Sequence, residues 1–269
     1  MNDFPCIITL TTDFGTSDAY VGTMKGVILG INPNVRVVDL THAVPPQDIH
    51  EAAFTIYSAY RYFPKGTIHT VVVDPGVGSD RQAIVCEIDG AFFVCPDNGV
   101  LGYLLQAIDG SVEHRMKAVA IQNPGYHLPE VSNTFHGRDI FAPVAAHLSR
   151  GVPLASIGPR VENLVQLPIP IPEVSGNTIT GQIVKIDRFG NAITNISETV
   201  LAGEVSGYEI NVQGVRLTHI NRAYAESAVG EPLAIIGSFG VLEIAVNGGS
   251  AESRLGLKWG DVVEIQRFD

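Results

Sequence analysis

Cysteine is scarce in this sequence, and so is positive charge. Three cysteines occur among the 269 residues, Cys6, Cys86 and Cys95, an odd number without a closely spaced pair. This pattern excludes a disulfide framework and predicts reduced thiols in a cytoplasmic protein. Lysine and arginine number 17 against 28 aspartates and glutamates, and the formal net charge is −11. The chain lacks the basic footprint of a nucleic-acid-binding protein, so we expect no nucleic-acid partner.

Long apolar runs are missing as well. No uninterrupted stretch approaches the ~20 apolar residues that a membrane helix requires, so we expect no membrane span. The first ten residues have no basic segment before their short apolar stretch, and we expect no secretory signal there. Apolar residues are nonetheless plentiful, at 45% against 17% charged, which is enough to build a core and argues against disorder.

The first part of the chain alternates between strand and helix patterns. Short β-branched runs are followed by stretches with apolar residues at helical spacing, and Asp89-Gly90 is typical of a two-residue hairpin turn. The expected strands are residues 6–12, 35–40, 67–73, 83–89 and 91–96, and the expected helices are residues 18–32, 48–63 and 99–108. Apolar strands that alternate with helices predict an α/β domain over residues 1–165, with a mostly parallel sheet flanked by helices.

The pattern changes after residue 165. Prolines at positions 168, 170 and 172 exclude a helix interior or a central strand, so residues 166–176 are predicted to be an extended linker. Beyond them, short β-branched segments alternate with glycine-rich turns. Residues 177–269 are therefore predicted to form a smaller, all-β, barrel-like C-terminal domain.

Polar or charged side chains stand where three of the predicted strands end. Asp13 follows the first strand, Thr41 and His42 follow the second, and the run VVVDPGVGSDR places Asp74 directly after a valine strand, with Arg81 seven residues later. Ligands of open α/β sheets bind outside the carboxyl ends of the strands, so these positions are candidate site residues. Asp13 has a second interpretation as the N-cap of the following helix, where aspartate is common.

Common cofactor and nucleophile motifs are not found. No G-x-G-x-x-G follows the first strand, no P-loop is present, and no G-x-S-x-G marks a serine nucleophile. Asp74, His136 and Asp139 offer three metal-ligating side chains, but no H-x-x-x-H or C-x-x-C spacing supports a metal site. We expect neither a metal nor a cofactor.

The segment DRFGNAITNI opens the second domain. Asp187, Phe189 and Asn191 alternate along it, so in an extended segment they share one face. An aromatic ring flanked by a carboxylate and an amide suits a purine, which offers both a stacking face and hydrogen-bonding edges. The alternative is a β-hairpin in which Gly190 and Asn191 are turn residues.

Five segments follow one another along nearly the whole chain: TLTTDFGTSDAYVGTMKG, VVVDPGVGSDR, CPDNGVL, TFHGRDIFAPVAAHL and DRFGNAITN. Together they resemble the S-adenosyl-L-methionine hydroxide adenosyltransferases, a family related to the fluorinases and chlorinases. The resemblance implies a homotrimer in which S-adenosyl-L-methionine (SAM) is held between the N-terminal domain of one subunit and the C-terminal domain of the next. It implies that SAM is the substrate and that water converts it to adenosine and L-methionine.

The resemblance also implies roles for individual residues. Asp74, Arg81 and His136 correspond to the set that activates water. The implied substrate-binding residues are Asp13 at the ribose, Phe135 at the reacting carbon, Asp187, Phe189 and Asn191 at the adenine and the methionine end, and Ser238 at the methionine. The halogenases carry an arginine beside that serine where this chain has Phe239, so what holds the methionine carboxylate is left open.

The implied reaction is consistent with these residue types. Attack at the ribose C5′ displaces a neutral thioether from a sulfonium, so charge is neutralised as the new bond forms, which a dry site favours. The always-charged Arg81 would stabilise an oxygen that becomes hydroxide-like. Either Asp74 or His136 takes the proton, and the sequence does not decide between them.

Two other functions fit parts of the sequence. A halogenase would place its halide beside Asp74, where repulsion at ~4 Å and an effective dielectric constant of about 20 is roughly 4 kcal/mol, about a thousandfold in affinity. The halogenases resemble this chain but have an aromatic residue at that position, and the fluorinase has a serine where this chain has Gly137. A SAM- or adenosine-binding sensor with little turnover is the third interpretation, although a sensor has no need of the full set of candidate catalytic groups.

Overall fold

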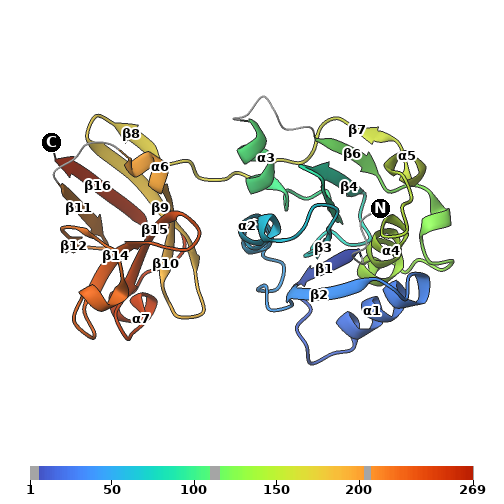
Figure 1. Ribbon diagram of the computed structural model, residues 1–269, viewed down its shortest axis with the longest axis horizontal. Coiled ribbons are helices and arrows are strands. Elements are labelled where there is room, and N and C mark those ends of the chain that lie inside the picture. Colours follow the sequence, from blue (N-terminus) through green and yellow to red (C-terminus); the bar gives the residue numbers. More distant parts are fainter. Residues whose placement is uncertain (1–5, 110–115, 203–206, 269) are drawn as a thin grey trace. The chain divides into compact units, whose positions relative to one another are not determined.

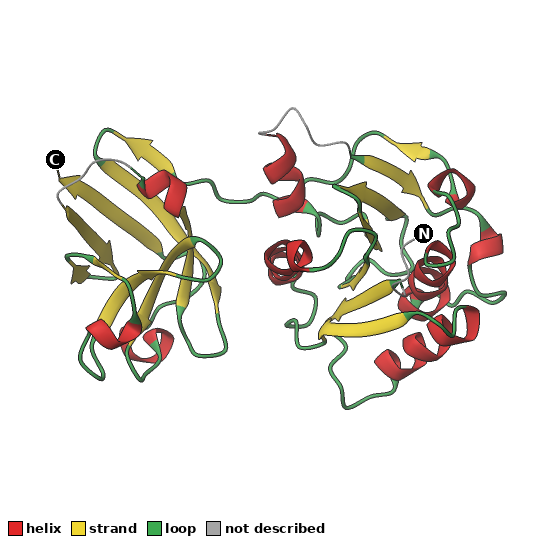
Figure 2. Cartoon of the chain, in the orientation of Figure 1, coloured by secondary structure: helices red, strands yellow, loops and turns green. Residues whose placement is uncertain are grey.

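The computed structural model describes residues 6–109, 116–202 and 207–268. The chain divides into two compact units, Met1–Pro168 and Ile169–Asp269, whose helices and strands are labelled in Figure 1 and coloured by secondary structure in Figure 2. The division falls inside the proline-rich segment, where three alternating prolines prevent both helix and central strand.

The first unit contains one seven-stranded sheet in the order β2-β1-β3-β5-β4-β6-β7. The strands are β1 (Ile7–Thr12), β2 (Arg36–Thr41), β3 (Ile68–Val72), β4 (Ala83–Ile88), β5 (Ala91–Pro96), β6 (Lys117–Ala120) and β7 (Arg160–Val161). Strands β2, β1, β3 and β5 pair in parallel, whereas β4, β6 and β7 pair antiparallel. The predicted α/β sheet flanked by helices is confirmed, and its parallel part is the half that contains the first three strands.

The antiparallel half begins at the predicted hairpin. Asp89 and Gly90 join β4 to β5 with φ angles of 51° and 81°, the left-handed values that a two-residue type I′ turn requires. A hairpin reverses the chain within two residues, so β4 cannot run parallel to β5 as a strand entered through a helical crossover would.

Helices cover both faces of this sheet. They are α1 (Tyr20–Ile31), α2 (Ile49–Ala59), η1 (Tyr60–Tyr62), α3 (Gly102–Asp109), η2 (Pro124–Tyr126), η3 (Gly137–Phe141), α4 (Ala142–Leu148) and α5 (Leu154–Ile157). One core packs Ile8 and Leu10 of β1 against α1 and α4, and the other packs Val71 and Val73 against α2 and α3. Burial on both faces explains why the strands read as continuous apolar runs.

The two central cysteines belong to the second of these cores. Cys86 and Cys95 are fully buried free thiols, and burial raises the pKa of Cys86 to about 12. Thiols in this state pack as small apolar groups and are poor nucleophiles, in agreement with their interpretation as core residues.

The second unit is a nine-stranded, barrel-like β-structure, as predicted. Its main path is β12-β11-β16-β9-β10-β15-β14-β13, and β8 adds to β9. The strands are β8 (Glu173–Ser175), β9 (Thr178–Ile186), β10 (Ala192–Ser197), β11 (Gly207–Val212), β12 (Val215–Leu217), β13 (Ile220–Asn221), β14 (Pro232–Ile236), β15 (Val241–Val246) and β16 (Val262–Phe268), with short helices α6 (Glu198–Leu201), η4 (Tyr224–Glu226) and α7 (Ala251–Leu255). Ile183, Ile244 and Ile265 lie in the core that these strands enclose. Within the described ranges, no helix of either unit has the length and apolar character needed to cross a membrane.

Candidate active site

A cavity of about 380 Å³ opens in the first unit, where the parallel strands end. Its walls come from the segments that follow β1, β2 and β3 and from the segment that leads into η3. The lining residues are Asp13, Phe14, Tyr20, Pro46, Gln47, Val72, Asp74, Pro75, Val77, Thr134, Phe135, His136 and Gly137. The position agrees with the rule that ligands of α/β sheets bind at the carboxyl ends of parallel strands.

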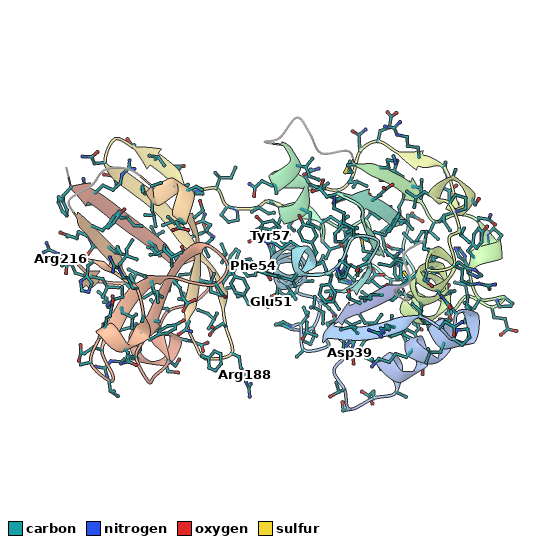
Figure 3. All side chains as sticks on the ribbon, in the orientation of Figure 1. Asp39, Glu51, Phe54, Tyr57, Arg188 and Arg216 are labelled. Atoms are coloured by element: carbon teal, nitrogen blue, oxygen red, sulfur yellow. The ribbon has the colours of Figure 1, made fainter. Side chains whose placement is uncertain are left out.

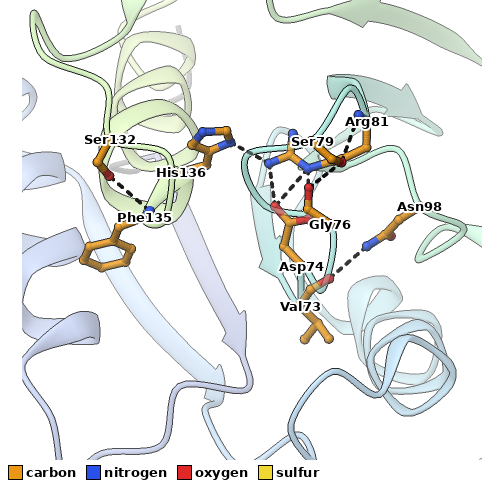
Figure 4. A network of polar contacts seen from close by, with 9 residues as sticks. All are labelled: Val73, Asp74, Gly76, Ser79, Arg81, Asn98, Ser132, Phe135 and His136. Atoms are coloured by element: carbon orange, nitrogen blue, oxygen red, sulfur yellow. Dashed lines mark hydrogen bonds and ion pairs between the residues drawn. The ribbon is translucent and has the colours of Figure 1, made fainter.

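Asp74, Arg81 and His136 meet at this cavity (Figure 4). Arg81 Nε donates to both carboxylate oxygens of Asp74, at 2.9 and 3.0 Å, and Nη2 donates to Oδ2 at 2.5 Å. The same Nη2 also donates to Nδ1 of His136 at 2.7 Å. The guanidinium therefore joins the carboxylate to the imidazole, and this pairing explains why a valine strand ends in an acid.

The contact with Arg81 fixes the protonation of His136. A guanidinium has donors only, so Nδ1 must accept, and the imidazole is neutral with its proton on Nε2. Burial lowers the pKa of His136 and the Arg81 charge lowers it further, while Asp74, Asp139 and a hydrogen bond with the Ser132 backbone act in the opposite direction. The guanidinium thus occupies Nδ1, the nitrogen that could otherwise accept a proton, which suits an orienting role better than that of a free base.

Arg81 lies behind the other two residues. Among the described residues that line the cavity, Asp74 and His136 appear and Arg81 does not. Its side chain is 11% exposed and its guanidinium lies 5.4 Å from the centroid of the Phe141 ring. Arg81 therefore acts on the cavity through the two groups that it holds.

Two glycines allow the turn from Asp74 to Arg81 to pack closely. A Cβ on Gly78, whose φ is 78°, would lie 2.4 Å from the carbonyl oxygen of Asn133, and a Cβ on Gly76 would lie 3.2 Å from Cγ of Arg81. The first contact is too short for any side chain. Glycine at position 78 thus lets the turn approach the segment that carries His136.

That segment is held by a buried carboxylate. Asp139 Oδ2 accepts from both the backbone N–H and the hydroxyl of Ser132, and Ser132 Oγ accepts from the backbone N–H of Phe135. Burial alone would raise the pKa of Asp139, but hydrogen bonds from Arg138 and Ser132 outweigh it and lower the pKa. Asp139 is thereby used within the protein rather than as a metal ligand. Among the described residues, no three side chains of His, Cys, Asp or Glu form a group that could hold a metal ion.

Residues 137–141 form a single π-helical turn between this segment and α4. His136 is the residue before the turn, and the turn passes directly into α4 at Ala142. Such wide turns occur mostly inside α-helices at functional sites. Here the turn sets the direction in which Phe135 and His136 leave the helix.

Three aromatic rings form one wall of the cavity. Phe14, Tyr20 and Phe135 lie with ring centroids 5.1–5.7 Å apart, in tilted and edge-to-face arrangements. Gly137 fits beneath them, since a Cβ there would lie 3.2–3.3 Å from atoms of Phe135, Met24 and Phe14. An apolar wall beside a charged pair suits a ligand with an aromatic or sugar part and a cationic centre.

Asp13 lines the cavity and also binds the loop after β2. Its Oδ2 accepts from the backbone N–H of Gln47 at 2.8 Å, and Gln47 has a φ of 67°, which non-glycine residues rarely adopt. The alternative interpretation of Asp13 as the N-cap of α1 is wrong, because the N-cap residue is Ala19. Sequence analysis missed Gln47, for which the only local signal is the pair of prolines before it.

The remaining predicted residues lie in the second unit. Asp187 Oδ1 accepts from the backbone N–H groups of Phe189 and Asn191, and Oδ2 accepts from the Asn191 side chain. This turn joins β9 to β10, so the hairpin interpretation is correct for the backbone. The Phe189 ring is 76% exposed, which leaves its face available to a ligand or to another surface.

Ser238 lies between β14 and β15, close in sequence to a buried acid that sequence analysis missed. Glu243 is 5% exposed and its Oε1 accepts from the Tyr224 hydroxyl at 2.6 Å. Burial raises the pKa of Glu243, and the neighbouring Asp187 carboxylate raises it further. Glu243 sits in an otherwise apolar strand, VLEIAV, which is the signal that could have identified it.

The fold and the site define a class of protein with two domains and an acid–guanidinium–imidazole set at the ends of the parallel strands. The family model described as "SAM hydroxide adenosyltransferase N-terminal domain" matches residues 8–158, and the model of the C-terminal domain matches residues 181–264. The chain belongs to the SAM hydroxide adenosyltransferase family.

Individual relatives cover nearly the whole chain. An (R)-S-adenosyl-L-methionine hydrolase of Thermus thermophilus is 41% identical over 263 residues, covering 94% of this chain and 97% of its own, and that of Salinispora tropica is 38% identical over 260 residues, covering 96% and 97%. A fluorinase of an Actinoplanes species is 29% identical over 296 residues, with 97% of both chains covered. The crystal structure of an uncharacterized conserved protein from Thermotoga maritima has a TM-score of 0.88 at 37% identity, covering 97% of this chain and 100% of that one.

Proposed function

We propose that this protein hydrolyses S-adenosyl-L-methionine to adenosine and L-methionine. The observation that carries the proposal is the Asp74 carboxylate at a strand end, bound by Arg81 and facing a cavity with an aromatic wall. The names of the hydrolases of Thermus thermophilus and Salinispora tropica support it, and they specify the (R) configuration at the sulfonium sulfur, which is stereogenic. We therefore propose (R)-SAM as the substrate.

The proposed reaction is a displacement at C5′ of the ribose. The oxygen of water forms the new bond to C5′, the C5′–S bond breaks, and its electron pair returns to sulfur as the neutral thioether of methionine. The water loses one proton as adenosine forms. Since a cation and water give two neutral products and a proton, the site has to orient the water and accept that proton, with no strong anion to generate beforehand.

Asp74 is the residue that we propose for this task. His136 already accepts from Arg81 through Nδ1, and its other nitrogen carries the proton in this tautomer. Asp74 faces the cavity, and its Oδ1 accepts only one N–H from Arg81, so this oxygen keeps a lone pair for the water, whereas Oδ2 accepts two. In this scheme Arg81 and His136 are positioning residues that hold the carboxylate and the rim of the cavity.

Substrate binding is proposed for residues of both units. Asp13 would bind the ribose hydroxyls through its free oxygen, and Phe135 would pack against the reacting carbon. In the second unit, Asp187, Phe189, Asn191 and Ser238 would hold the adenine and the methionine part. The sulfonium favours the Asp74 side of the cavity because a carboxylate and aromatic faces both attract a cation.

We further propose that the protein is a homotrimer with each site completed by a neighbouring subunit, and that it acts in the cytoplasm. The exposed Phe189 ring is consistent with a surface that becomes covered on assembly. Sedimentation should show a trimer, and a fully active monomer would contradict this part of the proposal. The odd, small number of cysteines supports the location.

Product analysis tests the reaction itself. The purified protein is incubated with (R)-SAM and with (S)-SAM, each with and without chloride, and adenosine, methionine and chlorodeoxyadenosine are separated by chromatography. We expect adenosine and methionine in equal amounts, faster from (R)-SAM, and no halogenated nucleoside. Formation of chlorodeoxyadenosine would favour the halogenase, and tight binding without product would favour the sensor.

A matched pair of variants tests the role of Asp74. Asp74→Ala should abolish most adenosine formation, with a loss of about 10²–10⁴-fold in kcat, while SAM binding is largely retained. Asp80→Ala removes an exposed carboxylate from the same turn and serves as the control. Normal turnover by Asp74→Ala would show that the assignment is wrong.

A further inference from the structure

His42 is buried immediately after β2 and connects two cavity loops. Its exposed fraction is 6%, and among the described residues that line the cavity it does not appear. It follows Thr41, whose β2 position pairs with Thr11 of β1. The side chain of His42 reaches Thr12, the last residue of β1, and its backbone reaches the segment after β1, which carries Asp13 and Phe14.

Two hydrogen-bonded contacts join His42 to the end of β1 and to the loop after it. Nδ1 of His42 lies 2.8 Å from Oγ1 of Thr12, and the carbonyl oxygen of His42 accepts from the backbone N–H of Gly15 at 2.8 Å. Thr12 Oγ1 in turn accepts from the backbone N–H of Phe14 at 3.2 Å. The Thr12 hydroxyl therefore links the His42 imidazole to the backbone N–H of Phe14, a residue of the aromatic wall.

The far side of the imidazole faces an ion pair. Nε2 of His42 lies 3.0 Å from Oδ1 of Asp39, a residue of β2 labelled in Figure 3, and Asp39 Oδ2 accepts from Lys25 Nζ of α1 at 2.6 Å. A carboxylate beside Nε2 favours the tautomer that carries its proton there. The lone pair on Nδ1 is then free to accept the Thr12 hydroxyl proton, while Thr12 Oγ1 accepts from Phe14.

A further bond completes the connection between the two loops. Asp13 Oδ2 accepts from the backbone N–H of Gln47, which lies in the same loop as His42. The end of β1 and the loop after it are thus joined to the loop after β2 at three places: through Thr12, Gly15 and Asp13. Only the last of these involves a carboxylate that faces the cavity.

We propose that His42 is a positioning residue for substrate binding, acting through Thr12 to hold Asp13 and Phe14 in the cavity wall. The inference rests on the proposed function, because substrate affinity is its readout. It goes beyond the residues assigned to the site, since neither His42 nor Thr12 lines the cavity. Loss of the His42–Thr12 contact should weaken binding while leaving the Asp74 set in place.

The same sheet provides a matched control. Thr9, three residues earlier on β1, lies 2.8 Å through Oγ1 from Nδ1 of His69 on β3, and all of Thr9, Thr12 and His69 are fully buried. Thr9→Val removes the same hydroxyl–imidazole contact from the same strand at a position away from the cavity. Thr12→Val and Thr9→Val should therefore lower the melting temperature comparably, but only Thr12→Val should change substrate binding.

The measurement is the steady-state kinetics of adenosine formation, together with adenosine binding by equilibrium dialysis. We expect Thr12→Val and His42→Leu each to raise KM and the adenosine Kd about tenfold, with kcat changed less than about threefold, the size of effect expected when one loop-ordering hydrogen bond is lost. The double variant should match either single variant, because both remove one contact. Thr12→Ser, which keeps the hydroxyl, should restore the wild-type KM.

The outcomes separate the inference from the proposed function. A wild-type protein that forms no adenosine from either SAM epimer refutes the proposed function. An active wild type whose Thr12→Val and His42→Leu variants have the same KM and Kd as Thr9→Val and His69→Leu refutes the inference alone. If Thr12→Val is too unstable to assay, His42→Phe removes the Nδ1 acceptor while keeping an aromatic ring, and an unchanged KM in that variant would equally overturn the inference.

Discussion

Removing one member of the Asp74–Arg81 pair should destabilise the protein more than removing both, because both charges are largely shielded from solvent. The side chains are 5% and 11% exposed, and three N–H···O contacts of 2.5, 2.9 and 3.0 Å join them. Removing one member of such a pair typically costs about 3–5 kcal/mol, since the other charge stays buried alone, whereas replacing both can be nearly neutral. We expect Asp74→Asn and Arg81→Met each to lower the unfolding free energy of the first unit by about that amount, and the double variant to lower it by less than either.

Two probes separate this effect from a general loss of stability. Hydrogen exchange at the backbone amides of β3 reports on the first unit during urea titration. Trp259 is the only tryptophan of the chain and lies in the second unit, so its fluorescence gives an internal control that should not change. Adenosine formation is measured in parallel, and all three variants should lose about 10²–10⁴-fold in kcat.

The combination of results is what tests the reasoning. Stability should return in the double variant while turnover does not. Strictly additive losses, or single losses below about 1 kcal/mol, would mean that the pair behaves as a solvated surface ion pair. Recovery of turnover in the double variant would remove Asp74 from the proposed chemistry.

Other parts of the molecule give three more predictions. Burial lowers the pKa of His69 from 6.5 to about 4, so the stability that its neutral form contributes is complete above pH 6.5 and is lost as pH falls toward 4. The loss is roughly 3 kcal/mol, and urea titrations across that range should show no such loss in His69→Leu. An unchanged dependence of stability on pH in the variant would refute this prediction. Gly137→Ala should raise KM several-fold, because its Cβ would press on Phe135 and Phe14 at 3.2–3.3 Å; unchanged kinetics would mean that these rings move aside freely. Asp187→Ala removes three hydrogen bonds from the turn between β9 and β10 and should weaken SAM binding about tenfold without changing exchange in β3, and an unaltered Kd would count against a role for this turn.

Much of the fold could be predicted because its signals are local. The hairpin at Asp89-Gly90 depends on two residues that tolerate left-handed backbone angles, and the structure has it there. The apolar strands and the helical spacing indicated the α/β unit, since a strand buried on both faces needs apolar residues at every position. The pairing of β4 with β6 was not predictable in this way, because nothing in either strand specifies its neighbour.

The site was predictable only as far as the strand-end rule and the family resemblance reach. They indicated Asp13, Asp74 and the residues around His136, which the structure brings to one cavity. They did not show that Arg81 lies behind the cavity, because a distance of seven residues says nothing about which side of a turn the guanidinium occupies.

The strand-end rule also indicated Thr41 and His42, but the contacts made by the loop after β2 were beyond the sequence. Gln47 adopts a left-handed conformation without being glycine, and His42 lies buried between two loops. Both depend on contacts between segments that are about 30 residues apart in the chain, Asp13 with Gln47 and Thr12 with His42. Periodicity and turn propensity describe neighbours in sequence, so they carry no information about such contacts.

Because residues 137–141 form a π-helical turn, the number of residues in this turn determines the direction in which Phe135 and His136 point. An α-helix advances by about 100° per residue, so deleting one residue from the turn would convert it to regular helix and swing everything before it by roughly that angle. Phe135 and His136 would then face a different direction even though every side chain of the cavity had been kept. In this part of the chain we therefore expect single-residue insertions and deletions to be tolerated less well than most substitutions, and the register of the backbone to matter as much as the identity of the imidazole.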